Sequence, residues 1–401
     1  MGFILFSPDR FSTLKRATLS LALLSTSLVL LLVVSPYALA LSHKAHITSF
    51  INSTRIPTGG FQATPIIPPA SGVPVTGNPD VISTAQAIEM SIAMGNTSTD
   101  FSGDGTWVLD LKGIDGGFGL YTANTGETMI NAYYACYALN ATGKLQSLGS
   151  APHDWIYTLQ NTTNGGFADI AGGNVSTLAT YYAIGALYYL QNTTSIESLA
   201  SSVVNYLNQC KNSDNGYGSS IGAPSDLAGT WASVATMARI AQVNNSNLAY
   251  LVNSTLIQNY VNQSYFSNAS DTFNYGGYGT TRASIADTFY AMAIYTALGV
   301  KNPYAQQVED YLLGSLSNPG CQNVYDGGFA DKTTDASTAV QSSMTMTYYA
   351  FKALQGIDST LGMLNGEAWF LPLDWIPLAI IAAVAVVVII IGVRYYRAHR
   401  D

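Results

Sequence analysis

The sequence predicts an all-α fold of about five helix–turn–helix repeats, followed by one C-terminal transmembrane helix. The main observation is a glycine–aromatic motif that recurs through the chain. It occurs at residues 115–119, 164–169, 215–218, 275–279 and 325–331, and the glycines that precede the aromatic ring are 49, 50, 61 and 51 residues apart. A period near fifty residues indicates a repeat architecture.

Helical patterns follow each glycine motif and justify the all-α assignment. They contain adjacent aromatics and alanines near Tyr133, Tyr181, Phe289 and Tyr348, and the remaining copy carries Trp231 in the same place. Each repeat is therefore expected to be helix, glycine turn, helix, with about ten helices in all. A single pair cannot bury its apolar face, so neighbouring pairs must stack. The period alone does not decide between an open solenoid and a closed ring.

The repeat region is expected to span residues 79–370. Asn78-Pro79 offers an N-cap and a proline at the first helical position. Residues 41–78 are expected to be a linker rich in Pro, Gly, Thr and Ser. The Gly59-Gly60-Phe61 sequence inside it resembles the repeat motif, but no helix signals flank it. It is therefore left out of the repeat count.

Two apolar segments flank this region. Residues 1–40 carry basic residues, then an apolar run that ends in Ala38-Leu39-Ala40, which is typical of a cleaved signal peptide, an N-terminal anchor being the alternative. Residues 376–393 are apolar and uncharged, with aromatics before them and arginines after. This pattern predicts a single-pass transmembrane helix, with residues 394–401 as a cytoplasmic tail and the repeat region outside the cytoplasm, at the cell surface.

Glycosylation sequons support the extracytoplasmic prediction. The chain has ten Asn-x-Ser/Thr sequons, at Asn52, Asn96, Asn140, Asn161, Asn174, Asn192, Asn244, Asn253, Asn262 and Asn268. Residues 81–370 contain eight Lys or Arg against twenty Asp or Glu. Because an acidic surface repels polyanions, no nucleic-acid partner is expected.

The glycine motifs also carry a family resemblance. A turn written Gly-Gly-Phe-Ala-Asp, followed by a Tyr-Tyr-Ala…Ala-Leu helix, resembles the β subunits of protein prenyltransferases and is similar to the squalene and terpenoid cyclases. The resemblance covers all five counted motifs. It implies a closed α/α toroid, in which inner helices ring an aromatic-lined cavity. Those families have six or so helix pairs, so one pair is unaccounted for or absent.

The chemistry of those families does not carry over to this sequence. The prenyltransferase zinc ligands Asp, Cys and His fall on Asp287, Phe289 and Met346. One oxygen ligand out of three does not hold Zn²⁺, so no metal or other cofactor is expected. The acidic Asp-x-Asp-Asp run of the cyclases does not occur either. A lone Asp287 is a candidate acid if burial raises its pKa, and the alternative is that it caps a helix.

Candidate ligand-binding residues are aromatic, with one cation. In a toroid the inner helices turn one face to the cavity, and the residues expected there are Tyr134, Tyr182, Trp231, Tyr290 and Tyr349, with Arg282 nearby. Acidic residues in the turns suggest either ordinary turn capping, a Ca²⁺ site or glycoside hydrolysis.

Three functions remain open from the sequence. The first is a toroid that binds an isoprenoid, a glycan or a surface protein without zinc catalysis. The second is an enzyme acting on isoprenoid lipid or glycan, of prenyl- or terpenoid-transferase or cyclase type, with an active site around Asp287, Tyr290 and Arg282. The third is a structural component of the cell envelope, which predicts a cavity filled by side chains.

Overall fold

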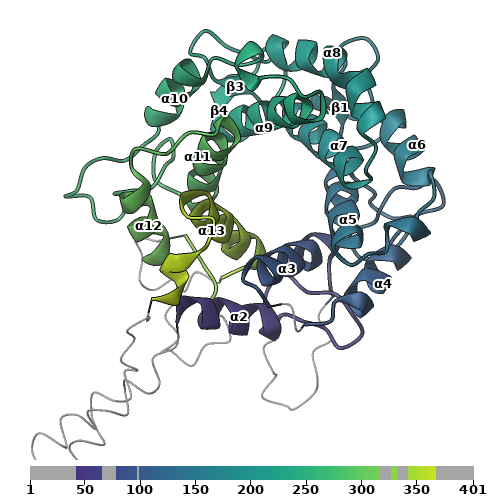
Figure 1. The fold of residues 1–401 in the computed structure, drawn as a ribbon, viewed down its shortest axis with the longest axis horizontal. Helices are drawn as coiled ribbons and strands as arrows, with labels where there is room; N and C mark the ends of the chain where they lie inside the picture. The colour runs from purple at the N-terminus through teal and green to yellow at the C-terminus, as the bar shows by residue number, and fades with distance from the viewer. Residues whose placement is uncertain (1–41, 66–77, 97–98, 317–326, 332–341, 367–401) are drawn as a thin grey trace, which may run out of the picture.

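The computed structural model describes residues 42–65, 78–96, 99–316, 327–331 and 342–366, which form two concentric rings of helices (Figure 1). The inner ring consists of α3 (Val81–Ala93), α5 (Met129–Ala141), α7 (Thr177–Tyr189), α9 (Leu227–Val243), α11 (Ile285–Leu298) and α13 (Met344–Ile357). The outer ring consists of α2 (His43–Ser53), α4 (Ser102–Asp110), α6 (Ala151–Thr158), α8 (Thr193–Gln209), α10 (Ser254–Asn262) and α12 (Ala305–Leu313). Each inner helix packs against the next, and α13 packs against α3. The ring is therefore closed, as the resemblance implied.

Short two-residue strands and 3-10 turns complete the connections. β1 (Phe167–Ala168) pairs antiparallel with β2 (Val175–Ser176), and β3 (Tyr217–Gly218) pairs in the same way with β4 (Ser225–Asp226). The 3-10 turns are η1 (Leu145–Ser147), η2 (Leu248–Tyr250) and η4 (Gly362–Asn365).

Every inner helix begins with the same cap. The N-cap side chain accepts a hydrogen bond from the backbone N–H three residues on, at Asp80, Thr128, Ser176, Asp226, Ser284 and Ser343. Such a cap is worth about 1 kcal/mol of helix stability. These caps fix where each inner helix starts, and therefore which face it turns to the centre.

A threonine four residues after most of these caps holds the glycine motif. Its hydroxyl accepts the backbone N–H of the motif's aromatic residue at 2.9–3.0 Å, as in the bond from Phe61 N to Thr84 Oγ1 and its counterparts at Thr180, Thr230, Thr288 and Thr347. The motif is thus fixed directly to the inner helix that follows it.

The two motif positions before the ring have different requirements. The first adopts a positive φ, as at Gly276 (φ 88°), which L side chains rarely do. The second lies against an aromatic side chain of the next outer helix: a Cβ on Gly216 would lie 2.6 Å from the Tyr260 ring of α10. Close packing, rather than backbone angle, therefore demands glycine at the second position.

The range expected to be linker contains the missing sixth repeat. Within residues 41–78, α2 occupies His43–Ser53, and Gly59-Gly60-Phe61 forms the same motif turn, with Phe61 fully buried. The linker prediction therefore fails for this part of the range. The α2 sequence has a weak apolar face of few residues, which is why no helix was expected beside the motif.

This first repeat closes the ring against the last one. The backbone N–H of Met344, at the start of α13, donates to the carbonyl of Ala63 at 2.8 Å. A Cβ on Gly328 would lie 2.6 Å from the ring of Phe50 in α2. The packing of a motif glycine against an aromatic ring of the next outer helix, as seen between Gly216 and Tyr260, thus also joins the sixth repeat to the first.

The transmembrane part of the predicted fold class is not supported. Among the residues that the structure describes, no helix is both long enough and apolar enough to cross a membrane. The predicted span at residues 376–393, the tail after it and the N-terminal segment 1–40 lie outside the described residues. That prediction was based on the apolar length of the run, the aromatics before it and the arginines after it, and no helix that the structure describes supports it.

Candidate functional site

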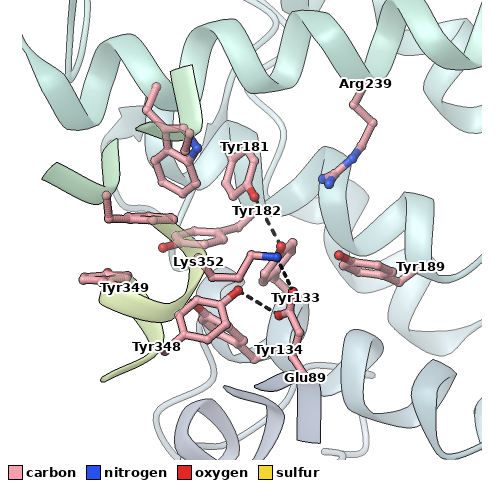
Figure 2. Close-up of a pocket in the computed structure, with 13 residues that line it drawn as sticks. Glu89, Tyr133, Tyr134, Tyr181, Tyr182, Tyr189, Arg239, Tyr348, Tyr349 and Lys352 are labelled. Carbon is pink, nitrogen blue, oxygen red and sulfur yellow. Dashed lines mark hydrogen bonds and ion pairs between the residues drawn. The ribbon is translucent and has the colours of Figure 1, made fainter. Parts of the chain in front are cut away.

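A cavity of about 160 Å³ lies at the centre of the ring and is walled by all six inner helices (Figure 2). Its walls comprise Glu89 of α3, Tyr133 and Tyr134 of α5, Tyr181, Tyr182 and Tyr189 of α7, Trp231 and Arg239 of α9, Phe289 and Ala293 of α11, and Tyr348, Tyr349 and Lys352 of α13. The wall is therefore aromatic, with three charged side chains.

Aromatic rings form a continuous circuit around the cavity. Successive centroids lie 5.6 Å apart between Tyr133 and Tyr181, 4.4 Å between Tyr181 and Trp231, 5.3 Å between Trp231 and Phe289, 6.5 Å between Phe289 and Tyr348, 6.4 Å between Tyr348 and Tyr134, and 5.1 Å between Tyr134 and Tyr133. Aromatic pairs at such distances contribute about 0.5–1.5 kcal/mol each beyond the area that they bury. The circuit leaves a small lumen with rigid walls.

An ion pair crosses the wall between the last and first inner helices. Lys352 Nζ lies 2.9 Å from Glu89 Oε1, and the Tyr348 hydroxyl donates to Glu89 Oε2 at 2.8 Å. Lys352 Nζ also donates to Gln355 at 2.7 Å. Glu89 is therefore both neutralised and hydrogen-bonded, as a partly buried carboxylate requires.

Hydroxyl groups of the tyrosines supply the remaining polar surface. Burial raises the pKa values of Tyr134, Tyr182 and Tyr348 well above the usual value of a tyrosine, so these three hydroxyls stay protonated at neutral pH. Tyr133 and Tyr181 bond through their hydroxyls at 3.2 Å. The wall thus presents neutral groups that can both donate and accept hydrogen bonds.

Arg239 is the second cation, and it differs from Lys352. Its guanidinium carbon lies 5.1–5.7 Å from the ring centroids of Tyr181, Tyr188 and Tyr189. Within the described residues, its buried Nη1 makes no hydrogen bond, and no carboxylate lies in ion-pairing range. Burial by itself lowers the pKa of Arg239. The neighbouring tyrosines, Tyr181 first among them, raise the pKa by more than burial lowers it, so the side chain stays charged.

Four of the aromatic residues predicted from the sequence lie on the cavity wall: Tyr134, Tyr182, Trp231 and Tyr349. The fifth, Tyr290, is packed against the ring of Trp231 at 5.2 Å and that of Tyr349 at 5.8 Å, and is not part of the wall itself.

Asp287 and Arg282 lie away from the cavity. Asp287 is in the first turn of α11, where its carboxylate accepts the hydroxyl proton of the N-cap Ser284 at 2.9 Å. Burial raises the pKa of Asp287, with Asp331 and Asp226 adding to the rise and the bond to Ser284 opposing it. Arg282 is exposed in the turn before α11. The three residues of the predicted enzymatic site thus do not meet in the central cavity.

Sequence reasoning missed the charged part of the wall. Glu89, Arg239 and Lys352 are each the one charged residue of an otherwise uncharged inner helix, α3, α9 and α13. That isolation was a usable signal, because a lone charge on a buried helix needs a polar destination. Tyr133, Tyr181 and Tyr348 were missed because one residue per aromatic pair was assigned to the cavity, although both members of these pairs reach it.

The zinc ion of the resembling transferases does not fit the side chains at the corresponding positions. Asp287 is engaged with Ser284, and the Phe289 ring stacks on Tyr349 with centroids 4.6 Å apart. Met346 offers only a thioether, which is a poor ligand for Zn²⁺. Of these three side chains, only one can bind zinc.

Acidic residues of the turns bind backbone N–H groups. Asp115 accepts from Gly117 N, and Asp214 from Gly216 N, both at 3.0 Å. The acid that ends a motif caps a neighbouring inner helix: Asp331 accepts from Ile285 N at 2.6 Å. These contacts are those of ordinary turn and helix capping.

The closed ring and its aromatic centre define an α/α toroid. The chain belongs to the prenyltransferase alpha-alpha toroid domain family, whose model matches residues 6–363. No curated protein matches it.

Solved structures with the same fold have diverse functions. Candida albicans protein geranylgeranyltransferase-I, complexed with GGPP, is similar with a TM-score of 0.54 at 13% identity, over 72% of this chain and 88% of that one. The type II terpene cyclase MstE from Scytonema gives 0.54 at 12% identity, over 80% and 98%. A glycoside hydrolase family 76 mannosidase from Bacteroides thetaiotaomicron gives 0.51 at 9% identity, over 80% and 98%. At these identities the likeness establishes the fold alone.

Proposed function

We propose that this protein is a binding toroid whose central cavity holds one sugar residue of a glycan, without zinc catalysis. The observation that carries the proposal is a ring-sized cavity whose walls alternate aromatic faces with tyrosine hydroxyls and an ion pair.

Cavity size favours a single ring over a long chain. An apolar cavity of about 150 Å³ holds one benzene molecule, and the cavity here is about 160 Å³. A twenty-carbon isoprenoid needs several times that volume. The volume therefore fits one six-membered ring.

Wall chemistry favours a sugar over a hydrocarbon. A sugar ring has an apolar face, which suits the rings of Trp231 and Phe289, and a rim of hydroxyls, which suits the tyrosine hydroxyls and the Glu89–Lys352 pair. A hydrocarbon would make no hydrogen bond to these polar groups. One structural neighbour, the family 76 mannosidase, acts on a glycan, which is consistent with the proposal.

A glycan array probed with the full-length chain tests this function, with calorimetry on the glycans that bind. Trp231→Ala removes the central stacking surface and is expected to weaken binding about tenfold or more, which corresponds to about 1.4 kcal/mol. Tyr250→Ala is the matched control: Tyr250 is 85% exposed, is not part of the cavity wall, and its loss should leave binding unchanged.

Geranylgeraniol is tested in the same calorimeter as the isoprenoid alternative to a sugar. Saturable binding of this lipid with no glycan bound would overturn the sugar proposal in favour of an isoprenoid. A purely structural ring is the second candidate, and it is favoured by close aromatic packing, with ring centroids 4.4 Å apart between Tyr181 and Trp231 and 4.6 Å apart between Phe289 and Tyr349. Failure of both ligand classes to bind would support that second candidate.

We also propose that the ring works outside the cytoplasm as a glycoprotein. None of the ten sequon asparagines is buried: seven are exposed and three half-buried. A glycosidase-dependent mobility shift of the chain, purified from a host that glycosylates exported proteins, tests this. An unshifted band would contradict it.

A further inference from the structure

We propose that Arg239 is an anion-binding residue, which selects an acidic sugar whose carboxylate it binds. This inference rests on the proposed function, since it names the class of sugar that the same cavity takes.

Arg239 is placed as a ligand-binding cation. Its side chain extends from α9 toward the tyrosines of the cavity (Figure 2), and it forms part of the wall. Nη1 is buried and makes no hydrogen bond to any described residue. A buried, unpaired donor on a charged group is costly to a fold unless something else binds it. A ligand in the cavity would supply that partner.

Charge in the cavity is unbalanced by one positive charge. The wall has one acid, Glu89, and two cations, Lys352 and Arg239. Lys352 neutralises Glu89 at 2.9 Å, so the guanidinium is the excess charge. The chain as a whole has a formal net charge of −8, so the positive charge of Arg239 in the cavity does not reflect an overall excess of basic residues. The excess of one charge matches a ligand with one negative charge.

Tyrosine rings around Arg239 orient the guanidinium without neutralising it. Tyr181, Tyr188 and Tyr189 lie near it on α7, and Tyr133 reaches it from α5. Cation–π contacts stabilise a guanidinium without occupying its N–H groups. The guanidinium also bonds to the Tyr133 side chain, and within the described part of the chain Nη1 is left without a hydrogen bond. The free Nη1 suits a carboxylate oxygen, which accepts a charge-assisted hydrogen bond.

A glycine on α7 leaves the space that the guanidinium occupies. A Cβ on Gly185 would lie 2.7 Å from Arg239 Nη1 and 2.5 Å from the Tyr133 ring. Glycine in a helix interior costs about 1 kcal/mol of helix stability relative to alanine. Gly185 therefore lowers the stability of α7 and in return leaves room for the Arg239 guanidinium.

A carboxylate fits better than a phosphate. A phosphate monoester carries between −1.5 and −2 charges near neutral pH, more than one free cation balances. A hexuronic acid carries one negative charge on a single six-membered ring, as both the charge and the cavity volume require.

Calorimetry on the full-length chain tests the inference. Glucuronate and galacturonate are compared with glucose and galactose, and glucose 6-phosphate and galactose 6-sulfate are added as other anions. We expect the uronates to bind about ten- to a hundredfold more tightly than the neutral sugars, the range that a charge-assisted hydrogen bond gives. Arg239→Gln should remove this preference, whereas Arg239→Lys should keep part of it.

The outcomes separate the two proposals. Equal affinity for uronates and neutral sugars would overturn the acidic-sugar inference and leave the sugar-binding function standing. Tighter binding of the phosphate or sulfate ester would overturn the carboxylate assignment. If no sugar binds, the proposed function fails as well. Should Arg239→Gln not fold, the comparison of sugars on the unaltered chain still decides.

Discussion

Lys352 Nζ lies 2.9 Å from Glu89 Oε1, although 263 residues separate them in the chain. This ion pair joins the last inner helix, α13, to the first, α3, so it lies where the ring closes. The same pair forms part of the cavity wall. This contact therefore takes part both in closing the ring and in forming the cavity.

Lys352→Met is expected to destabilise the fold by about 1–2 kcal/mol. The variant leaves the Glu89 carboxylate with only the Tyr348 hydroxyl, and the cost is below that of a fully buried pair because both side chains keep some solvent contact. Urea unfolding measures it. The double variant Glu89→Gln/Lys352→Met should recover part of the loss; an additive loss would show that the pair is not coupled.

Gly216→Ala is expected to cost about 1–3 kcal/mol, as overpacking of a core does. The new methyl group would lie 2.6 Å from the Tyr260 ring of α10. Gly103→Ala in α4 is the matched control, because a Cβ there meets nothing within 4 Å, and it should be neutral or stabilising. Equal effects of the two changes in thermal unfolding would refute the packing account of the motif.

Gly185→Ala should alter both the fold and the cavity. A Cβ there would lie 2.5 Å from the Tyr133 ring and 2.7 Å from Arg239 Nη1, so both side chains must shift. We expect a net cost of about 1–3 kcal/mol, as overpacking of a core gives, together with loss of uronate preference in calorimetry. Unchanged preference would show that Arg239 tolerates displacement.

Asp287→Asn tests the role of Asp287 through pH. Burial raises the pKa of Asp287 in the folded state. The stability linked to this group is therefore fully present below the pKa of the unfolded chain and is lost as pH rises through the raised folded value. Relative to the variant, the unaltered protein should weaken as pH rises from about 4 to 7. The change should stay below about 1 kcal/mol because the group is half-buried.

Asp358→Asn is the control for the pH series. The backbone N–H of Thr360, its hydroxyl and the N–H of Gly362 lower the pKa of Asp358. Stability linked to Asp358 is therefore present above the unfolded pKa and lost as pH falls through the lowered one. Urea unfolding from pH 3 to 7 should give opposite slopes for the two variants. Parallel slopes would contradict the assigned environments.

Local patterns explain what was predictable. The helix–turn–helix repeat was correct because its glycines, capping residues and helix aromatics act close together in the chain. The backbone N–H of Tyr217, for example, donates to Thr230 Oγ1, 13 residues further on. The first repeat was missed because α2 has little apolar pattern of its own. Its residues Ile47, Phe50 and Ile51 are buried in the closed ring, where Phe50 lies against Gly328 of the last repeat.

Four aromatic residues of the cavity wall were anticipated from the sequence, and its charged residues were not. Tyr134, Tyr182, Trp231 and Tyr349 lie on the cavity wall because aromatic residues at helical spacing share a face. The pairing of Glu89 with Lys352 spans the whole chain, and local pattern carries no information about it.

By itself, the sequence determined the repeat unit and its helical character, because capping, glycine conformation and helical periodicity are local properties of the chain. Tertiary structure alone decided the number of pairs in the closed ring, the size of the cavity and which charges face it. Ring closure is a sum of contacts between repeats, such as Phe50 against Gly328. Only closure brings the lone charges of α3, α9 and α13 around one cavity, where Lys352 is paired with Glu89 and Arg239 carries the excess positive charge.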